Sequence, residues 1–252
     1  MFHVKHDPRS GEHDSAGREP SRVCPNLTEA KEVVDEQSEE HDVTDRQLGE
    51  SAAVRSLFGD SYELVAGFGH LLRDQGELRG LIGPKEISRL WERHLLNSAA
   101  LAPYLPLVGT LADVGSGAGL PGVVIAMMCP SLDVTLIEPM ERRTVWLDEV
   151  VSHFNLANVT VRRGRADEFH GAFEFDVVTA RAVAALSKLA GWTLPLVRRG
   201  GELVLLKGQN IAAEIEPARK TLRKYKCSEP EILPGLTVPG VEPTTVLRVR
   251  RG

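Results

Sequence analysis

Cysteine is scarce in this chain of 252 residues, and its three cysteines stand far apart. Cys24, Cys129 and Cys227 form no C-x-x-C pair, which argues against a zinc ribbon, and their odd number argues against a disulfide framework. The eight histidines show no metal-ligand spacing, so we expect no metal site. No apolar run approaches the roughly 20 residues that cross a bilayer, and the polar start of the chain has no apolar signal-peptide core. These absences predict a reduced, cytoplasmic protein without a membrane segment.

Charge is uneven along the chain: residues 1–50 carry a net charge of −7, and the remainder carries +2. We predict that 1–50 is an acidic, disordered tail, because residues 1–25 contain almost no large apolar side chains. A helix over 29–41, with Thr28 as its N-cap, would have little to bury. The total charge of −5 does not exclude a nucleic-acid partner, since the body of the chain is mildly basic.

Apolar residues recur at helical spacing in the segment that follows the acidic tail. We therefore predict a small helical region over 51–108. Pro84 suits the first turn of its second helical segment, which we expect to continue through Trp91 to Leu96.

From residue 109 onward, strand-like and helix-like segments alternate, which is typical of a parallel sheet covered by helices on both faces. We expect strands over 111–114, 133–138, 159–162, 175–179 and 202–206. We expect helices over 120–129, 142–154, 183–197 and 211–226. The last two apolar segments, 231–238 and 244–249, have only a short link between them and predict an antiparallel hairpin.

The first of these strands leads into a glycine-rich turn. Gly115, Gly117 and Gly119 alternate with other residues, and an apolar helix-like run follows them. Glycine lets the backbone bend sharply and lets a ligand approach its N–H groups closely. Residues 117–122 also fit G-x-G-x-x-G, a dinucleotide pattern, but this match is weak because the alternating glycines produce the same spacing.

Three features favour S-adenosylmethionine over a dinucleotide in this turn. Asp113 precedes Gly115 by two residues, where its carboxylate can pair with a methionine ammonium but would repel a pyrophosphate. Glu138 ends the next strand, where it can accept hydrogen bonds from ribose hydroxyls, although NAD sites share this feature. A sheet that ends in a hairpin is typical of methyltransferases. We therefore assign Asp113, Gly115, Gly117 and Glu138 to the cofactor, with a tight turn that binds nothing as the alternative.

These expectations together predict a Rossmann-like, class I S-adenosylmethionine-dependent methyltransferase fold. We expect a mostly parallel seven-stranded sheet with a C-terminal antiparallel hairpin, which together form a methyltransferase domain over 109–252. Ligands of such sheets bind at the carboxyl ends of the strands.

The run DVGSGAGLPG, from Asp113 to Gly122, resembles the RsmG (GidB) methyltransferase family. Further segments resemble the family in the same order: RHLLNS (93–98), ERR (141–143), GRADEF (164–169), TARAVAAL (179–186) and LLKGQ (205–209). The resemblance covers about residues 54–250. It implies methyl transfer from S-adenosylmethionine to N7 of guanine 527 in 16S ribosomal RNA, with the 30S subunit or its assembly intermediate as partner.

The resemblance also implies roles for individual residues. The family's cofactor contacts correspond to Gly115, Leu120, Ala166, Asp167 and Arg181. Its basic active-site residues correspond to Arg165, Arg181 and Lys207.

Two departures from the family pattern limit what can be transferred. Many members carry Asn-Leu-Thr before the second N-terminal helix, whereas this chain has GLIGP at residues 80–84, so a role for that asparagine does not transfer. Asn97 stands where the HxLDS motif commonly has aspartate, which removes a charge.

Motifs that are missing from the chain, first of all after the strand expected at 175–179, restrict which kind of atom can accept the methyl group. The Asn/Asp-Pro-Pro-aromatic motif that grips exocyclic amines is missing, and Thr179-Ala180-Arg181 follows instead. A pyrimidine carbon needs a Pro-Cys nucleophile, but Cys129-Pro130 has the reverse order. Guanine N7 has a free lone pair and loses no proton, so it suits a site with basic residues and no general base.

Arg165, Arg181 and Lys207 each follow an expected strand, so we expect them on the ligand side of the sheet. Arginine offers a bidentate fork to guanine O6 or to phosphate. Donation to N7 itself would block methylation, so we expect contacts with phosphate, O6 or the cofactor carboxylate. A surface ion pair is the alternative for each of the three residues.

Two other functions stay open from the sequence alone. One is a methyltransferase that acts on a small molecule. The other is a nucleotide-binding protein without methyltransferase activity, against which the carboxylate of Asp113 argues. We expect the protein to be a monomer.

Overall fold

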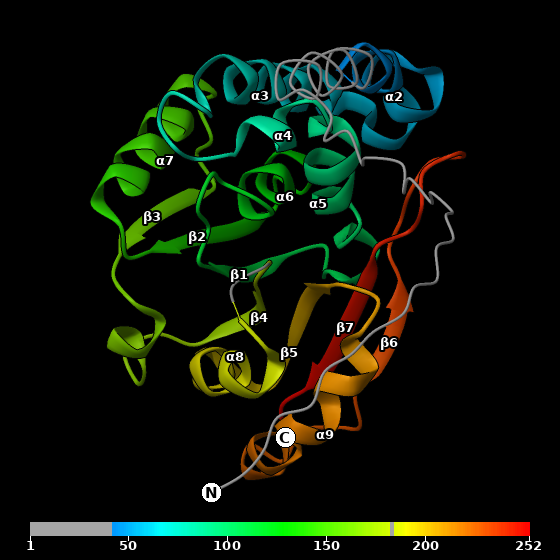
Figure 1. Ribbon diagram of the computed structural model, residues 1–252. Helices are drawn as coiled ribbons and strands as arrows, with labels where there is room; N and C mark the ends of the chain where they lie inside the picture. The colour runs from blue at the N-terminus through cyan, green and yellow to red at the C-terminus, as the bar shows by residue number, and fades with distance from the viewer. Residues whose placement is uncertain (1–41, 182–183) are drawn as a thin grey trace, which may run out of the picture. The chain divides into compact units, whose positions relative to one another are not determined.

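A computed structural model describes residues 42–181 and 184–252, all of which belong to one compact unit. Its centre is a seven-stranded sheet in the order β3-β2-β1-β4-β5-β7-β6 (Figure 1). The strands are β1 (Gly109–Val114), β2 (Leu132–Glu138), β3 (Val159–Arg163), β4 (Phe175–Thr179), β5 (Val197–Lys207), β6 (Glu231–Pro234) and β7 (Thr245–Arg250). β1 to β5 pair in parallel, and β7 pairs antiparallel with both β5 and β6. The predicted sheet and its C-terminal hairpin are therefore confirmed.

Helices cover both faces of the sheet and create a separate hydrophobic core on each. One core lies between α3 (Tyr62–Gln75), α6 (Gly122–Met128), α7 (Glu141–His153) and sheet residues such as Leu111. The other lies between α8 (Leu186–Thr193), α9 (Ile211–Lys224) and sheet residues such as Ala112. Neighbouring residues of one strand thus enter opposite cores, as the alternation of side chains along a strand requires.

The prediction of a helix over 183–197 is wrong at the C-terminal end. α8 ends at Thr193, Pro195 lies in a 3₁₀ turn (Leu194–Leu196), and Val197 begins β5. Proline has no N–H to continue an α-helix, so the chain tightens and leaves the helix there. β5 also begins five residues before the expected start at 202, because Val197 already pairs with Phe175 of β4; the register then shifts before Glu202 pairs with Val177, and Gly200 (φ 75°) lies in this irregular stretch. Val183 lies outside the described residues.

The N-terminal region is helical as predicted, but it is divided into short elements. α2 (Ala52–Phe58) and α3 precede α4 (Pro84–Ile87), in which Pro84 holds the predicted first position. The helix expected to run on to Leu96 breaks after Ile87 and resumes as a π-helical turn, Trp91–Leu96, followed by α5 (Asn97–Ala99). None of the helices in the described part of the chain is long and apolar enough to cross a membrane.

Residues 42–50 are a helix, so the folded region extends into the stretch expected to be a tail. Asp45 is 5% exposed, and its carboxylate accepts hydrogen bonds from the backbone N–H groups of Trp91 and Glu92, each at 3.0 Å. Arg73 of α3 pairs with the same carboxylate at 3.5 Å. The boundary expected at residue 50 is therefore placed too late. The expectations for residues 1–41 lie outside the described residues.

Gly49 tests whether this helix is part of the fold. A Cβ atom at Gly49 would stand 2.1 Å from Nε1 of Trp91, whose ring is held by Phe58 and Tyr62. We expect Gly49→Ala to lower the free energy of unfolding by about 1–3 kcal/mol, the usual cost of overpacking, in urea titrations. Gly191→Ala in α8 is the matched control, because none of the described residues outside its own turn of helix comes within 4 Å of its Cβ position. Equal stability of the two variants would contradict the packing of residues 42–50 against Trp91.

Candidate cofactor and acceptor site

A cavity of about 560 Å³ lies beyond the carboxyl ends of the parallel strands β1 to β4. Its lining includes the glycine turn after β1, the end of β2, the segment after β3, and Arg181 after β4. Residues 81–83, which precede α4, also line it, together with Glu86, His94 and Trp192. Parallel sheets bind ligands at this edge, so the cavity stands where the sequence analysis expected one.

Eight of the ten predicted site residues line this cavity: Gly115, Gly117, Leu120, Glu138, Arg165, Ala166, Asp167 and Arg181. The other two do not line it: Asp113 is buried behind the glycine turn, and Lys207 lines a second cavity. Sequence reasoning missed Glu86, Met140 and Trp192, which also line the cavity. The position of Met140 just after β2 could have indicated it, whereas no local signal marks Glu86 or Trp192.

The glycine turn has a backbone conformation that only glycine adopts readily. Gly115, Gly117 and Gly119 have φ angles of 76°, 57° and 101°. A Cβ atom at Gly119 would also collide with Val123 at 2.7 Å, whereas one at Gly117 would stand 3.7 Å from its nearest described neighbour, the carbonyl of Gly115. Gly119 therefore packs the turn against α6, whereas at Gly117 it is the positive φ angle that favours glycine.

Glu138 ties the turn to the end of β2. Its side chain is 2% exposed, and its two oxygens accept the backbone N–H groups of Gly117 (3.0 Å) and Met140 (2.9 Å). Arg143 of α7 lies 3.8 Å from the same carboxylate. A carboxylate has about four acceptor positions, so Glu138 can also accept hydrogen bonds from a ligand in the cavity that it lines.

Asp113 lies behind the turn and is fully buried. Its side chain shares the sheet face of Leu111, and Oδ2 accepts the N–H of Gly122 at the start of α6, at 3.0 Å. Oδ1 has no hydrogen-bond partner among the described residues. Burial raises the pKa of Asp113 to about 6, although the Gly122 N–H favours the charged form. This position supports a role in holding the turn rather than the direct contact with a methionine ammonium that the sequence suggested.

The segment after β3 forms one wall of this cavity with Arg165, Ala166 and Asp167. Ala166 is buried, while Arg165 and Asp167 are exposed and pair with each other at 3.2 Å. The side chain of Arg165 is 62% exposed, so this pair contributes little to stability. Arg165 is therefore available to a ligand at the mouth of the cavity.

Lys207 lines a second cavity of about 590 Å³ in front of β5 and β7. Its Nζ donates to Oε2 of Glu214 (2.8 Å) and to the carbonyl of Ala184 (2.9 Å), and its side chain is only 9% exposed. The same Glu214 oxygen accepts the N–H of Leu186 at the start of α8. The ion pair that was the alternative for Lys207 is therefore present, and it anchors the beginning of α8.

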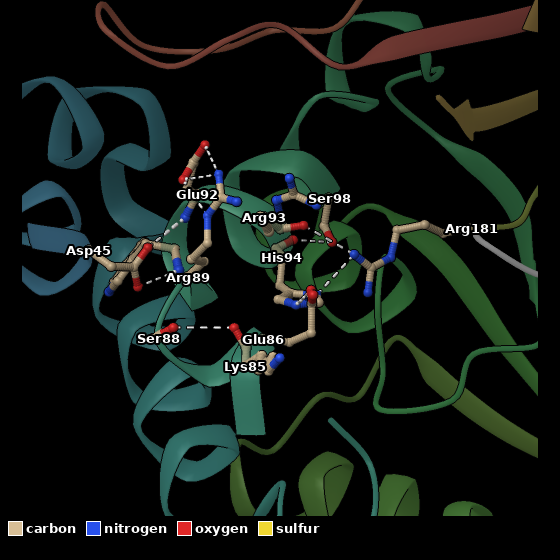
Figure 2. Close-up of polar contacts among 11 residues, drawn as sticks. Asp45, Lys85, Glu86, Ser88, Arg89, Glu92, Arg93, His94, Ser98 and Arg181 are labelled. Atoms are coloured by element: carbon tan, nitrogen blue, oxygen red, sulfur yellow. Dashed lines mark hydrogen bonds and ion pairs between the residues drawn. The ribbon is translucent and has the colours of Figure 1, made fainter. Parts of the chain in front are cut away.

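Arg181 stands where the two cavities meet, together with His94 and Glu86, because all three line both of them. Its backbone forms a parallel bridge with Leu206 of β5. Its Nη1 donates to Nδ1 of His94 (3.0 Å) and to the carbonyl of Arg93 (3.2 Å) (Figure 2). Arg181 is thus the predicted basic residue best placed between a cofactor in the first cavity and an acceptor in the second.

The strand order, the antiparallel last strands and the cavity at the carboxyl ends define a Rossmann-like, class I methyltransferase fold. A solved structure described as a putative O-methyltransferase from Klebsiella pneumoniae shares this fold. The two align with a TM-score of 0.50 and 12% identity over 73% of this chain and 90% of that chain.

Sequence comparison identifies the family. The model of the GidB family, described as rRNA small subunit methyltransferase G, matches residues 61–235. A protein from Thermobifida fusca named ribosomal RNA small subunit methyltransferase G is 51% identical over 79% of this chain and 84% of its own length. A protein of the same name from Beutenbergia cavernae is 53% identical over 70% of this chain and 83% of its own length. A third, from Clavibacter michiganensis, is 49% identical over 80% and 95%. The chain belongs to the GidB family.

The pH dependence of stability tests the buried position of Asp113. Its pKa of about 6 in the folded state exceeds the ordinary value of 3.8, so its stabilising contribution is full below pH 3.8 and is lost as the pH rises through 6. We expect the stability of Asp113→Asn relative to the natural protein to increase between pH 4 and pH 7, by up to about 3 kcal/mol. Chemical denaturation at both pH values measures this difference. Asp133→Asn, at an exposed position on β2, is the control for the loss of a carboxylate at the surface.

Proposed function

We propose that this protein binds S-adenosylmethionine in the first cavity and transfers its methyl group to N7 of a guanine in 16S ribosomal RNA. The observation that carries the proposal is the pair of adjoining cavities, which share Arg181 at the edge of a methyltransferase-type sheet. Membership of a family described as rRNA small subunit methyltransferases supports RNA as the substrate class. When bound, the cofactor supplies an electrophilic methyl group on a sulfonium.

The residues of the first cavity fit this cofactor. Glu138 offers a buried acceptor to ribose hydroxyls, and Gly117, which lines the cavity without a side chain, lets a ligand approach the backbone of the turn closely. Leu120, Ile137 and Ala166 give an apolar wall suited to a purine ring. The roles of Gly115, Asp167 and Arg181 as further cofactor contacts are part of the proposal.

Arg181 is proposed to hold the acceptor. Among the described residues, its guanidinium forms hydrogen bonds only through Nη1, which leaves Nε and Nη2 for a ligand. These donors suit guanine O6 or a phosphate, and O6 is adjacent to N7 on the same edge of the base. Methylation of N7 needs alignment of its lone pair with the methyl–sulfur bond and no general base, so fixed donors are the main requirement.

The RNA partner is proposed to be the 30S subunit or its assembly intermediate, bound by a monomer. The second cavity contributes Arg93 and Gln209 beside Arg181, groups that can contact phosphates and bases. Arg165 at the mouth of the first cavity adds an exposed guanidinium. Lys207 contributes indirectly in this proposal, because its amine is already bound to Glu214.

Cofactor affinity tests the role of Glu138. We expect Glu138→Gln to weaken binding of S-adenosylhomocysteine roughly 10–100-fold in calorimetry, because a hydrogen bond to a charged group contributes about 1.5–3 kcal/mol. Glu141→Gln is the matched control: Glu141 lies three residues further on, and its carboxylate is exposed and paired with Arg163. Unchanged affinity in both variants would contradict the assignment of Glu138 to the cofactor.

Methyl transfer tests the function itself. The protein is incubated with labelled S-adenosylmethionine and either purified 30S subunits or naked 16S ribosomal RNA that lacks the modification. We expect one labelled guanine, modified at N7, which reverse transcription after borohydride and aniline treatment locates. Label on small molecules alone would favour the small-molecule enzyme. Binding of NAD without affinity for S-adenosylhomocysteine would favour a nucleotide-binding protein without this activity.

A further inference from the structure

Arg181, His94 and Glu86 form a chain of hydrogen bonds at the junction of the two cavities (Figure 2). Nη1 of Arg181 lies 3.0 Å from Nδ1 of His94, and Nε2 of His94 lies 3.0 Å from Oε2 of Glu86. His94 is 8% exposed, so both contacts are largely shielded from water. The methyl-transfer chemistry proposed above assigns no task to His94 or Glu86.

The partners of His94 determine which ring nitrogen carries the proton. A guanidinium can only donate, and an ionised carboxylate can only accept. Nδ1 must therefore accept from Arg181, and Nε2 must donate to Glu86. Burial and the charge of Arg181 lower the pKa of His94 to about 4, with a smaller effect of Arg93, while Glu86 opposes the shift. The ring is thus neutral near pH 7 and able to accept.

The backbone that carries His94 is held from two directions. His94 belongs to the π-helical turn Trp91–Leu96, a local geometry often found at functional sites. Asp45 accepts the first two N–H groups of this turn, from Trp91 and Glu92, and the hydroxyl of Ser98 donates to the His94 carbonyl at 2.6 Å. The ring therefore has a fixed place from which to meet Arg181.

Arg181 is held by two consecutive residues of this turn, because Nη1 also donates to the carbonyl of Arg93. With Nη1 fixed on both acceptors, the plane of the guanidinium is set before any ligand binds. Without the His94 contact, the guanidinium of Arg181 would keep only the hydrogen bond to the Arg93 carbonyl and could rotate about it. Preorganised donors are effective because they need no reorganisation during the reaction.

We propose that His94 is a positioning residue for Arg181, and that Glu86 keeps His94 in the tautomer that accepts from the guanidinium. This inference rests on the proposed methyl transfer, in which Nε and Nη2 of Arg181 hold the acceptor. The segment 84–98 would thus serve to position Arg181, a task that neither the glycine turn nor the other basic residues perform.

A double-mutant cycle tests the proposal. His94→Ala is expected to lower kcat for methylation of 30S subunits or 16S ribosomal RNA roughly 10–100-fold, with a smaller change in KM. If His94 acts through Arg181, the double variant His94→Ala/Arg181→Ala loses no more than Arg181→Ala alone. Losses that multiply would overturn the proposal. His70→Asn on the exposed face of α3 is the control and should keep the natural rate.

Two isosteric variants keep the test valid if His94→Ala fails to fold. Asparagine places an acceptor near the position of Nδ1, and glutamine places a donor near that of Nε2. We expect His94→Asn to retain most of kcat, because it can still accept from Arg181, and His94→Gln to resemble the alanine variant. Equal activity of the Asn and Gln variants, with thermal stabilities within a few degrees of each other, would contradict a specific contact at Nδ1.

The ring itself gives a readout that does not need activity. Nitrogen NMR of the whole protein should show His94 with its proton on Nε2 and an unprotonated Nδ1 at pH 7. Arg181→Ala should raise the pKa of His94, because it removes both the donor at Nδ1 and a nearby positive charge. A proton on Nδ1 would overturn the proposal, because His94 could then not accept from Arg181. If His94 has the expected tautomer but neither RNA substrate is methylated, the proposed function fails, whereas the contact between His94 and Arg181 stands.

Discussion

Two buried carboxylates hold the glycine turn, and the rest of the site depends on that arrangement. Asp113 accepts the N–H of Gly122 from behind the turn, and Glu138 accepts the N–H of Gly117 from the end of β2. A buried carboxylate without partners costs several kcal/mol, so these N–H groups must keep pointing at the two acidic side chains. Only glycine gives the turn the positive φ angles that this requires. The start of α6 and the wall of the first cavity follow from the same constraint.

The sheet determines which residues meet at this turn. Parallel strands bring their carboxyl ends to one edge, so residues far apart in the chain line one cavity. Arg181 extends this edge, because it follows β4 and bridges to Leu206 of β5. Its guanidinium consequently lies between the cavity in front of β1 to β4 and the cavity in front of β5 and β7. The order of the strands, more than any local motif, makes Arg181 the shared residue.

The elements that sequence reasoning predicted well are those with local signals. The alternation of strands and helices, the turn and the final hairpin each depend on patterns within about ten residues. The family resemblance implied an active-site role for Lys207, and its place after an expected strand put it on the ligand side of the sheet. Its amine is instead held by Glu214 of α9 and by the carbonyl of Ala184, which lies 23 residues earlier in the chain. The helix over 42–50 escaped prediction for a similar reason, since the contacts of Asp45 are 46 and 47 residues away. Composition alone described that segment as acidic and polar.

The N-terminal helices are thus part of the proposed site rather than an attachment to the sheet. Asp45 holds the π-helical turn, that turn carries His94, and His94 contacts Arg181 between the cavities. The first and last of these links are hydrogen bonds between parts of the chain that are distant in sequence. A nucleophile that loses no proton places no demand on the neutral ring of His94 as a base. The ring is then free to serve as an acceptor for the guanidinium, and its low pKa, which would hinder a general base, keeps that acceptor available near neutral pH.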